Sequence, residues 1–224
     1  RRADKALAPF HWEVEFPEVF ERENPGFDGI VGNPPFLGGT IISTELGEPY
    51  RDWLYGSFKQ ASNRCDLVAY FFRRCFEVLR RAGVFGLIAS NTVAQGDTRA
   101  GGLRWICQHG GYILSASKRV KWPGLAAVVV SVVHITKGSS PDKMILNHRE
   151  VSTITAFLFH RGGHDDPAKL QSNAGYSFSG EKIYGQGFIF DDTDKSGVVT
   201  PLAEMRRLIG QDPHNANVIF PYIG

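Results

Sequence analysis

Apolar residues in the first part of the chain are spaced as in alternating strands and helices. Phe27 to Gly32 is a short apolar run before a proline-rich turn and predicts a buried strand. Gly47 to Phe58 carries its large apolar side chains at helical spacing, and Asp66 to Ala82 is the clearest amphipathic helix. Asp66 is a suitable cap for the start of that helix, and Gly83 is a suitable stop.

The same alternation continues further along the chain. Val84 to Ser90 is almost continuously apolar, as expected of a strand covered on both faces. Thr98 to His109 predicts a helix weakened by two glycines. Tyr112 to Ser117 and Ala127 to Thr136 predict two more strands, joined by a basic loop. This order predicts an α/β fold, an open sheet with helices on its faces.

The composition changes near residue 140. Gly138 to Asp142 is typical of a linker, and the remainder is rich in glycine and aspartate, with a final helix expected from Pro201 to Ile209. We therefore assign residues 1–140 to one domain and residues 141–224 to a linker and the start of a second domain.

Overall composition excludes several classes of protein. With 42% hydrophobic and 21% charged residues, the chain can form a packed core and is not wholly disordered. A formal charge of +2 is too even to indicate nucleic acid, so any basic surface has to be local. Three cysteines without CxxC spacing fit a reducing cytoplasm. No apolar run spans a bilayer and no signal layout opens the chain, so we expect a cytoplasmic protein without membrane contact.

Other charged clusters have ordinary interpretations. Arg73, with three further arginines nearby, is expected on the polar side of its helix. The sequence HRGGHDDP from His160 to Pro167 matches no standard metal spacing, so no metal site is predicted. The chain contains no Walker loop, no dinucleotide fingerprint and no cysteine placed as a nucleophile.

The candidate chemistry lies at Asn33-Pro34-Pro35-Phe36, where the first predicted strand ends. Open α/β sheets bind ligands at the carboxyl ends of their strands. The Asn33 side chain and a nearby backbone carbonyl are acceptors, and neither proline has an N–H that competes. Each residue before a proline is held extended, which fixes the direction of these carbonyls. Phe36 offers a face on which a base can stack, worth roughly 1–3 kcal/mol.

Such a turn suits an exocyclic amine. The N6 of adenine is a poor nucleophile because its lone pair is delocalised into the ring. Two acceptors that hold both of its hydrogens favour a tetrahedral nitrogen and free the lone pair for a methyl sulfonium donor. Positioning and electrostatics then supply most of the catalysis.

The sequence resembles a known family at these residues and beyond. FDGIVGNPPF is similar to motif IV, (D/N/S)-P-P-(Y/F), of the amino-methylating DNA methyltransferases. The run FHWEVEFPEVF from Phe10 to Phe20 resembles the large adenine methylases of fused type II restriction–modification and phage-defence systems. Three later segments look like motifs V, VI and VIII of the family, in order: Asp66 to Phe71, Gly83 to Asn91, and Val120 to Gly124.

The resemblance implies a fold and site residues. The fold is the C-terminal half of a Rossmann-like S-adenosylmethionine-dependent sheet, followed by the beginning of a target-recognition region. Phe71 and Asp66 are then cofactor-binding residues, although Phe71 fits a core position equally well. Trp122 contacts the flipped base.

Beside Trp122, three basic residues have two interpretations. Lys118, Arg119 and Lys121 either contact DNA phosphates or form a solvated charged loop.

One part of the family pattern is missing. The glycine-rich motif I loop, which holds the methionine end of the cofactor, does not occur between Arg1 and Asn33. We therefore expect this chain to be a piece of a longer protein that binds S-adenosylmethionine as a whole, and the piece alone to be inactive.

The resulting hypothesis is a site-specific DNA adenine-N6 methyltransferase of a restriction–modification or phage-defence system. Its partner is double-stranded DNA with a flipped adenine, and the parent can carry a fused nuclease or restriction subunit. Two alternatives stay open: methylation of RNA or of a protein amide nitrogen, and a non-catalytic DNA-binding module.

Overall fold

A computed structural model describes residues 10–122, 129–138, 140–168, 171, 189–195 and 197–221. The chain divides into two compact units, Arg1–Pro167 and Ala168–Gly224. No helix among the described residues has the length and apolar character needed to cross a membrane.

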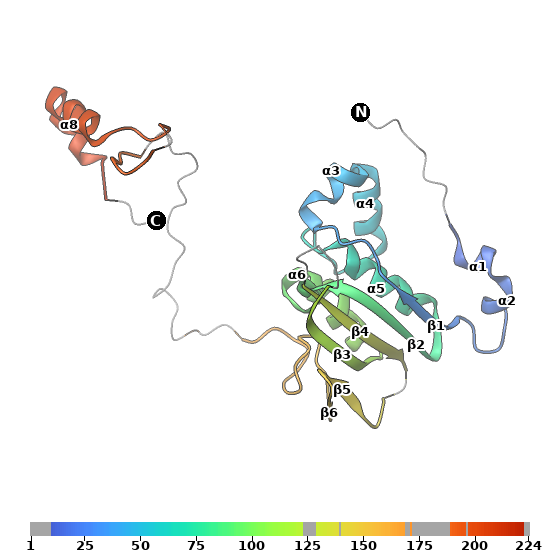
Figure 1. Ribbon diagram of the computed structural model, residues 1–224. Helices are drawn as coiled ribbons and strands as arrows, with labels where there is room; N and C mark the ends of the chain where they lie inside the picture. The colour runs from blue at the N-terminus through green and yellow to red at the C-terminus, as the bar shows by residue number, and fades with distance from the viewer. Residues whose placement is uncertain are drawn as a thin grey trace. The chain divides into compact units, whose positions relative to one another are not determined.

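Six strands form one mixed sheet in the first unit. They are β1 (Phe27–Gly32), β2 (Leu79–Ser90), β3 (Gly111–Lys121), β4 (Val129–Lys137), β5 (Met144–Leu146) and β6 (Arg149–Val151). Their order across the sheet is β1-β2-β4-β3-β5-β6 (Figure 1). β1 and β2 are parallel, as are β3 and β5, whereas β4 runs antiparallel to both of its neighbours. The predicted α/β class is confirmed.

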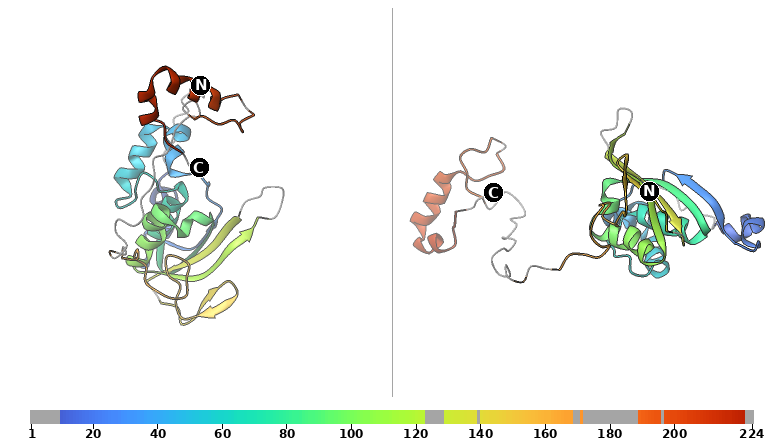
Figure 2. Two further views of the ribbon diagram at one scale, coloured as in Figure 1. Left: turned by 90° about the vertical axis from the view of Figure 1, so that its left-hand side faces the viewer. Right: turned by 90° about the horizontal axis from the view of Figure 1, so that it is seen from below.

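The helices of the first unit lie between the strands in sequence. They are α1 (Trp12–Glu15), α2 (Pro17–Phe20), η1 (Gly39–Ile41), α3 (Ile42–Leu46), α4 (Glu48–Ser57), α5 (Leu67–Val78), η2 (Asn91–Ala94), α6 (Gly96–Arg99), η3 (Ala100–Arg104) and α7 (Trp105–Gln108). The helices that connect the strands lie on one face of the sheet (Figure 2). The predicted helices at 47–58 and 98–109 correspond to α4 and to the consecutive α6, η3 and α7.

Two buried clusters stabilise this arrangement. The larger one joins α5 and α7 to the inner face of the sheet and includes the edge-to-face pair of Phe72 and Phe85, 5.7 Å between ring centroids. The smaller one joins η1–α4 to the start of α5 and includes Ile42 and Leu54. Each fully buried side chain of this size stabilises the fold by about 1.5–3 kcal/mol.

The two glycines of the 98–109 region are required by close packing. A Cβ at Gly101 would lie 2.9 Å from Cys65 Sγ, and one at Gly102 would lie 3.0 Å from Ala69 Cβ. Both glycines lie in η3, which is a π-helix. Single π-turns of this kind occur where a helix accommodates a local constraint. Helix propensity predicts that these glycines weaken the helix. In the structure their lack of a side chain allows η3 to pack closely against α5.

Helix α5 ends earlier than predicted. The chain passes directly from Val78 into β2, so Gly83 lies in a strand and does not stop the helix. Lys137 Nζ donates hydrogen bonds to the carbonyls of Glu77 and Leu79, at 3.0 and 2.7 Å, and so satisfies backbone groups at the helix end. A lysine about sixty residues away in the sequence thus bonds the backbone where α5 meets β2.

Two predictions of burial are wrong: that β1 is a buried strand, and that β2 is covered on both faces. β1 is the edge strand of the described sheet, and Val31 is 87% exposed. In β2 the inward Phe85 and Leu87 are buried, but Val84 is exposed. The cause is that the described helices cover only one face of this sheet.

The aromatic run that precedes β1 packs against its first residue. Trp12, Phe16 and Phe20 each lie with their ring centroids 5.4 Å from that of Phe27, in edge-to-face geometry. Such pairs contribute roughly 0.5–1.5 kcal/mol beyond the area they bury. The segment therefore anchors α1 and α2 at the amino end of β1.

Arg73 also departs from its predicted position. It is 3% exposed, donates from Nη1 to the Lys59 carbonyl at 2.7 Å, and lies 3.9 Å from the Trp105 ring centroid. Burial lowers the pKa of its guanidinium. The helical pattern places Arg73 among polar neighbours, but the α4–α5 connection and α7 cover it.

Residues 152–167, here called the strap, follow β6 and pack on the helical layer. Arg99, fully buried on α6, donates to the His164 carbonyl at 2.5 Å and to Asp166 Oδ1, and lies 3.8 Å from the Phe157 ring centroid. Arg104 and Gln108 bond Asp166 and Asp165, both at 2.9 Å. The histidine–aspartate sequence thus serves to hold the strap in place.

Past residue 140, the sheet continues through β5 and β6 within the first unit. The functional boundary expected there stays a prediction. The second unit contains α8 (Leu202–Gln211) and η6 (Pro213–Asn217), and α8 agrees with the helix expected from Pro201 to Ile209. An isolated bridge between Phe190 and Thr200 precedes it.

Candidate active site

The Asn33–Phe36 corner begins where β1 ends. Pro34 is buried and anchors the corner, whereas Asn33 is exposed and Phe36 is 40% exposed. Within the described residues, the Asn33 side chain makes no hydrogen bond, so its amide oxygen is free to accept one. The buried Pro34 thus holds the corner, and Asn33 and Phe36 are exposed to solvent.

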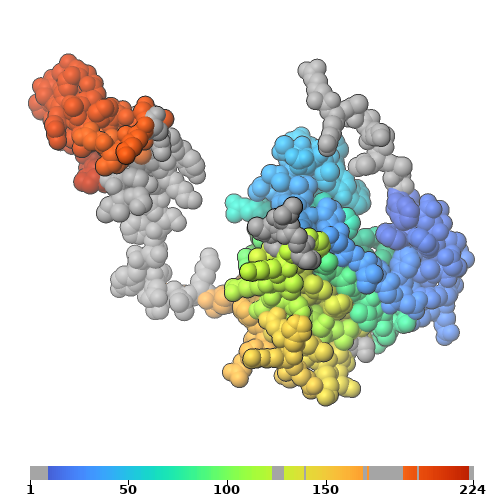
Figure 3. All heavy atoms as spheres, viewed as in Figure 1, coloured from blue at the N-terminus to red at the C-terminus, as the bar shows by residue number. Residues whose placement is uncertain are grey.

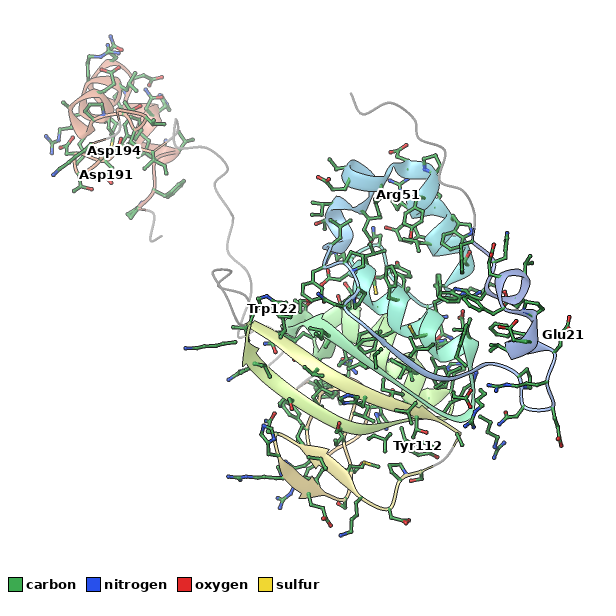
Figure 4. All side chains as sticks on the ribbon, turned by 45° about the vertical axis from the view of Figure 1, so that its right-hand side comes forward. Glu21, Arg51, Tyr112, Trp122, Asp191 and Asp194 are labelled. Atoms are coloured by element: carbon green, nitrogen blue, oxygen red, sulfur yellow. The ribbon has the colours of Figure 1, made fainter. Side chains whose placement is uncertain are left out.

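Sheet register brings Trp122 to the same end of the sheet. Gly32 pairs with Leu87 of β2, and three residues later Ser90 pairs with Val130 of β4. Val129 pairs with Lys121, the residue before Trp122 (Figure 4). At about 4.8 Å per strand, β1 and β3 lie about 14 Å apart, a gap across which a flipped nucleotide fits. Trp122 is half-buried, and residues 123–128 of its predicted motif lie outside the described residues.

The three predicted phosphate contacts lie in β3 rather than in a loop. A register shift separates Ser117 from Val120, and Arg119 there has φ +56°, as in a β-bulge. Lys118 lies 4.6 Å from the Phe159 ring centroid, and burial, followed by the Arg119 charge, lowers its pKa. Arg119 and Lys121 are exposed. Of the three, these two are presented to solvent.

The side chain of Asp66 does not make the capping hydrogen bond predicted for it. The residue occupies the cap position of α5 all the same. Its carboxylate accepts from the Gly39 N–H at 3.2 Å and from Thr92 Oγ1 at 2.6 Å, while its own N–H donates to Thr98 Oγ1 at 3.1 Å. The Leu67 N–H also donates to the Leu37 carbonyl at 2.8 Å. Asp66 therefore ties the segment after the corner to α5 and to η2.

The hydroxyl groups after β2 were missed in the sequence. Ser90 Oγ lies 2.7 Å from Thr92 Oγ1, which donates to Asp66. Asn91 accepts weakly from Ser131 Oγ at 3.5 Å. The sequence Ser90-Asn91-Thr92 at the end of an apolar strand could have indicated them. Polar residues at the carboxyl end of a strand commonly line a binding site.

Phe71 lies on the outer side of α5. It is 36% exposed, whereas its neighbour Phe72 is fully buried. Phe71 belongs to neither buried cluster. The structure does not support the core position predicted as one of two roles for Phe71. The other role, contact with the cofactor, stays a prediction, and the ring is exposed enough to contact a flat ligand.

The free cysteines are chemically quiet. Burial raises the pKa of the Cys65 and Cys107 thiols to about 12 and that of Cys75 to about 11. All three are protonated near neutral pH, and a thiol rather than a thiolate is a poor nucleophile.

The sequence around the corner is similar to a known family. Residues 1–108, which include β1, the corner, α5 and β2, match the model of the Eco57I restriction-modification methylases. Residues 1–108 are therefore similar to the Eco57I restriction-modification methylases. The matched region begins at residue 1 and ends with α7.

Two curated relatives agree with this similarity. The chain is 37% identical over 65 residues to the type II methyltransferase M.XhoI of Xanthomonas vasicola, which covers 29% of this chain and 11% of the relative. It is 30% identical over 80 residues to the type II methyltransferase M.BstVI of Geobacillus stearothermophilus, which covers 36% of this chain and 13% of the relative. The match thus spans only about an eighth or less of either relative.

A solved structure shares the fold of this chain. The type IIL restriction-modification enzyme MmeI, determined in complex with DNA, superposes with a TM-score of 0.59 at 19% identity. The match covers 92% of this chain and 28% of MmeI. The mixed sheet and its helices therefore have a counterpart within a larger protein.

Proposed function

We propose that this chain carries the target-base side of a DNA adenine-N6 methyltransferase from a restriction–modification or phage-defence system. The observation that carries the proposal is the outward, unpaired amide of Asn33 at the carboxyl end of β1, beside the exposed ring of Phe36. The similarity of residues 1–108 to the Eco57I methylases supports it. In this proposal strands β1 to β4 and their helices form the C-terminal half of the methyltransferase domain, and residues 141–224, which include β5 and β6, begin target recognition. Double-stranded DNA is the substrate.

Asn33 has the central role. Its amide oxygen and a backbone carbonyl of the Asn33–Pro34 stretch accept the two N6 hydrogens of a flipped adenine. This orientation holds the nitrogen lone pair toward the methyl donor, and the proton is lost after transfer. Because the buried Pro34 fixes the turn, little reorganisation is needed as charge develops.

Two aromatic residues hold the base. Phe36 stacks on the adenine, and Trp122 contacts it from the β3 side. Stacking is worth roughly 1–3 kcal/mol per base and offsets part of the cost of extruding a nucleotide.

S-adenosylmethionine is the methyl donor that the proposal requires, and its sulfonium supplies the activated methyl group. The described residues fit one side of such a ligand: the exposed face of Phe71 suits the adenine ring. Asp66, already bonded to Gly39 and Thr92, places the surrounding segments.

The test is Asn33→Ala in the full-length protein, with tritium-labelled S-adenosylmethionine and plasmid DNA. Methyl transfer to adenine should fall by roughly 10²–10³, as for the loss of one transition-state hydrogen bond. DNA affinity should be kept. Asn33→Asp retains an acceptor and should recover part of the activity.

Asn24→Ala is the matched control. Asn24 also precedes a proline and is exposed, but it lies before β1, where its amide donates to the Arg81 carbonyl at 3.2 Å. It should leave methylation unchanged. Label transferred to RNA or protein but not to DNA would contradict the proposal, as would full activity of Asn33→Ala.

A further inference from the structure

A polar cavity lies directly after the Asn33–Phe36 corner. It has a volume of about 410 Å³ and lies between η1–α3, α4 and the turn before α5. These helices form the light-blue upper lobe of the first unit (Figure 3). Its lining residues are polar apart from one glycine: Gly39, Thr40, Ser43, Arg51, Asp52, Tyr55, Asn63 and Arg64.

The two arginines of the cavity differ in their partners. Arg51 is paired with Asp52 at 2.8 Å and with Glu48 at 3.5 Å, so its charge is balanced (Figure 4). Arg64 is exposed, and only its backbone N–H is bonded, to Ser62 Oγ at 3.1 Å. Within the described residues, its guanidinium has no carboxylate partner. Among the residues that line the cavity, Arg64 is therefore the cation without a carboxylate partner in the described part of the chain, and it lies among hydroxyl and amide groups.

Arg64 is fixed beside the segment that leaves the corner. A Cβ at Gly39 would lie 2.5 Å from the carbonyl carbon of Arg64, so only glycine permits this contact. The adjoining Asp66 accepts the Gly39 N–H. Gly39 follows Asn33 by six residues, so the Cα atoms of these two residues lie at most about 21 Å apart. At 3.4 Å per nucleotide, this distance spans about six nucleotides of one strand.

We propose that this cavity binds a backbone phosphate of the DNA strand that flanks the flipped adenine, with Arg64 as its cation. The site rests on the proposed function and adds a contact that positions the strand. The guanidinium fork matches two phosphate oxygens, and the hydroxyls of Thr40 and Ser43 supply further donors. The unpaired guanidinium of Arg64 can pair with the single negative charge of a phosphodiester. Such a contact is independent of sequence.

The experiment measures the affinity of the full-length protein for a mixed-sequence duplex between about 50 and 200 mM salt. Arg64→Gln should weaken binding alike for duplexes with and without the recognised site. It should also reduce the slope of log K against log salt by about 0.9, the value of one phosphate contact. Arg64→Lys keeps the charge and should restore the slope while losing part of the affinity. Circular dichroism confirms that each variant is folded.

Arg81→Gln is the control. Arg81 is exposed near the start of β2, at the opposite end of the sheet from the corner, and removing it changes the net charge equally. It should leave the slope unchanged. An equal loss of slope in both variants indicates general electrostatics and overturns the site.

Two further outcomes separate this inference from the proposed function. Normal methylation by wild type, with an unchanged salt slope in Arg64→Gln, rejects the phosphate site alone. Absence of both DNA binding and methyl transfer in wild type rejects the function first and the site with it. A titration with inorganic phosphate completes the test: phosphate that binds through Arg64, without any effect of Arg64→Gln on DNA, also overturns the proposal.

Discussion

Asp66 shows how much one side chain of this protein organises. Its carboxylate accepts hydrogen bonds from Gly39, which follows the corner, and from Thr92, which follows β2. Its position at the start of α5 links both to the helix that packs beneath the sheet. Because a carboxylate bond of this kind contributes about 1.5–3 kcal/mol, its loss should be local but measurable.

We expect Asp66→Ala to loosen the segment from Leu37 to Ile41 while leaving the sheet intact. Amide hydrogen exchange at Gly39 should accelerate by about 10–100-fold, as follows from the loss of 1.5–3 kcal/mol. Thr92→Val removes the Thr92 hydroxyl bonds to Asp66 and Ser90 but keeps the bond from Gly39 to Asp66, so it should change Gly39 exchange much less. Equal exchange in wild type and Asp66→Ala would show that other contacts hold this segment.

Several elements are bonded by residues far away in the sequence. Lys137 bonds the carbonyls at the end of α5, and Arg99 bonds the His164 carbonyl of the strap. Arg99 is the more critical, because its guanidinium is fully buried and its Nε has no partner among the described residues. Removing the remaining carboxylate partner leaves a buried charge poorly compensated.

Asp166→Ala should therefore destabilise the first unit by roughly 1–3 kcal/mol. Urea denaturation followed by tryptophan fluorescence measures this change. The control is Asp165→Ala, which removes a bond to the exposed Gln108 and should cost about 0.5 kcal/mol or less. Similar values for the two variants would mean that the Arg99 pair contributes little.

At the scale of the whole molecule, local patterns predicted the elements and missed the contacts between distant ones. Strand β1 and helix α4 follow from apolar spacing that a short window contains. Strands β5 and β6 have three residues each, too few for any periodicity, and they form because β3 offers an edge. Arg73 was placed in solvent because a helical wheel does not include Trp105, which covers it.

The residues of the candidate site likewise differ in whether the sequence alone could indicate them. Asn33 and Phe36 could be predicted from the sequence because their proposed chemistry is contained in four consecutive residues. Arg64 and Thr92 were not found, because their roles depend on Gly39 and Asp66, which only the folded chain brings to them. The placement of Trp122 at the same end as Asn33 depends on the antiparallel direction of β4, which the order of elements alone does not fix.

Unfolding of the first unit should depend on pH through His164. Burial, and to a lesser extent Arg99, lowers the pKa of His164 from its usual 6.5, although the Asp165 charge opposes the shift. The Ala156 N–H donates to its Nδ1 at 3.1 Å, which requires the neutral ring. A lowered pKa in the folded state means that the unfolded state binds the proton first. Stability is therefore full above pH 6.5 and falls as the pH drops through the folded pKa.

The measurement is the free energy of unfolding from about pH 8 to pH 5, the range in which histidine titrates. His164→Gln retains an acceptor for the Ala156 N–H and should flatten the part of the curve below pH 6.5. Subtracting the two curves removes the contribution of the other titrating groups. A wild-type curve that rises on acidification, or two parallel curves, would contradict this assignment.

The edge position of β1 has a consequence for handling the protein. Within the described residues, one side of this strand has no neighbour, and Val31 leaves an apolar side chain in water. Open strand edges readily recruit other chains, which leads to aggregation unless they are covered. The strand that leads to Asn33 is thus an edge at which the first unit can pair with other chains. A molecule that covers this edge should reduce aggregation in concentrated samples.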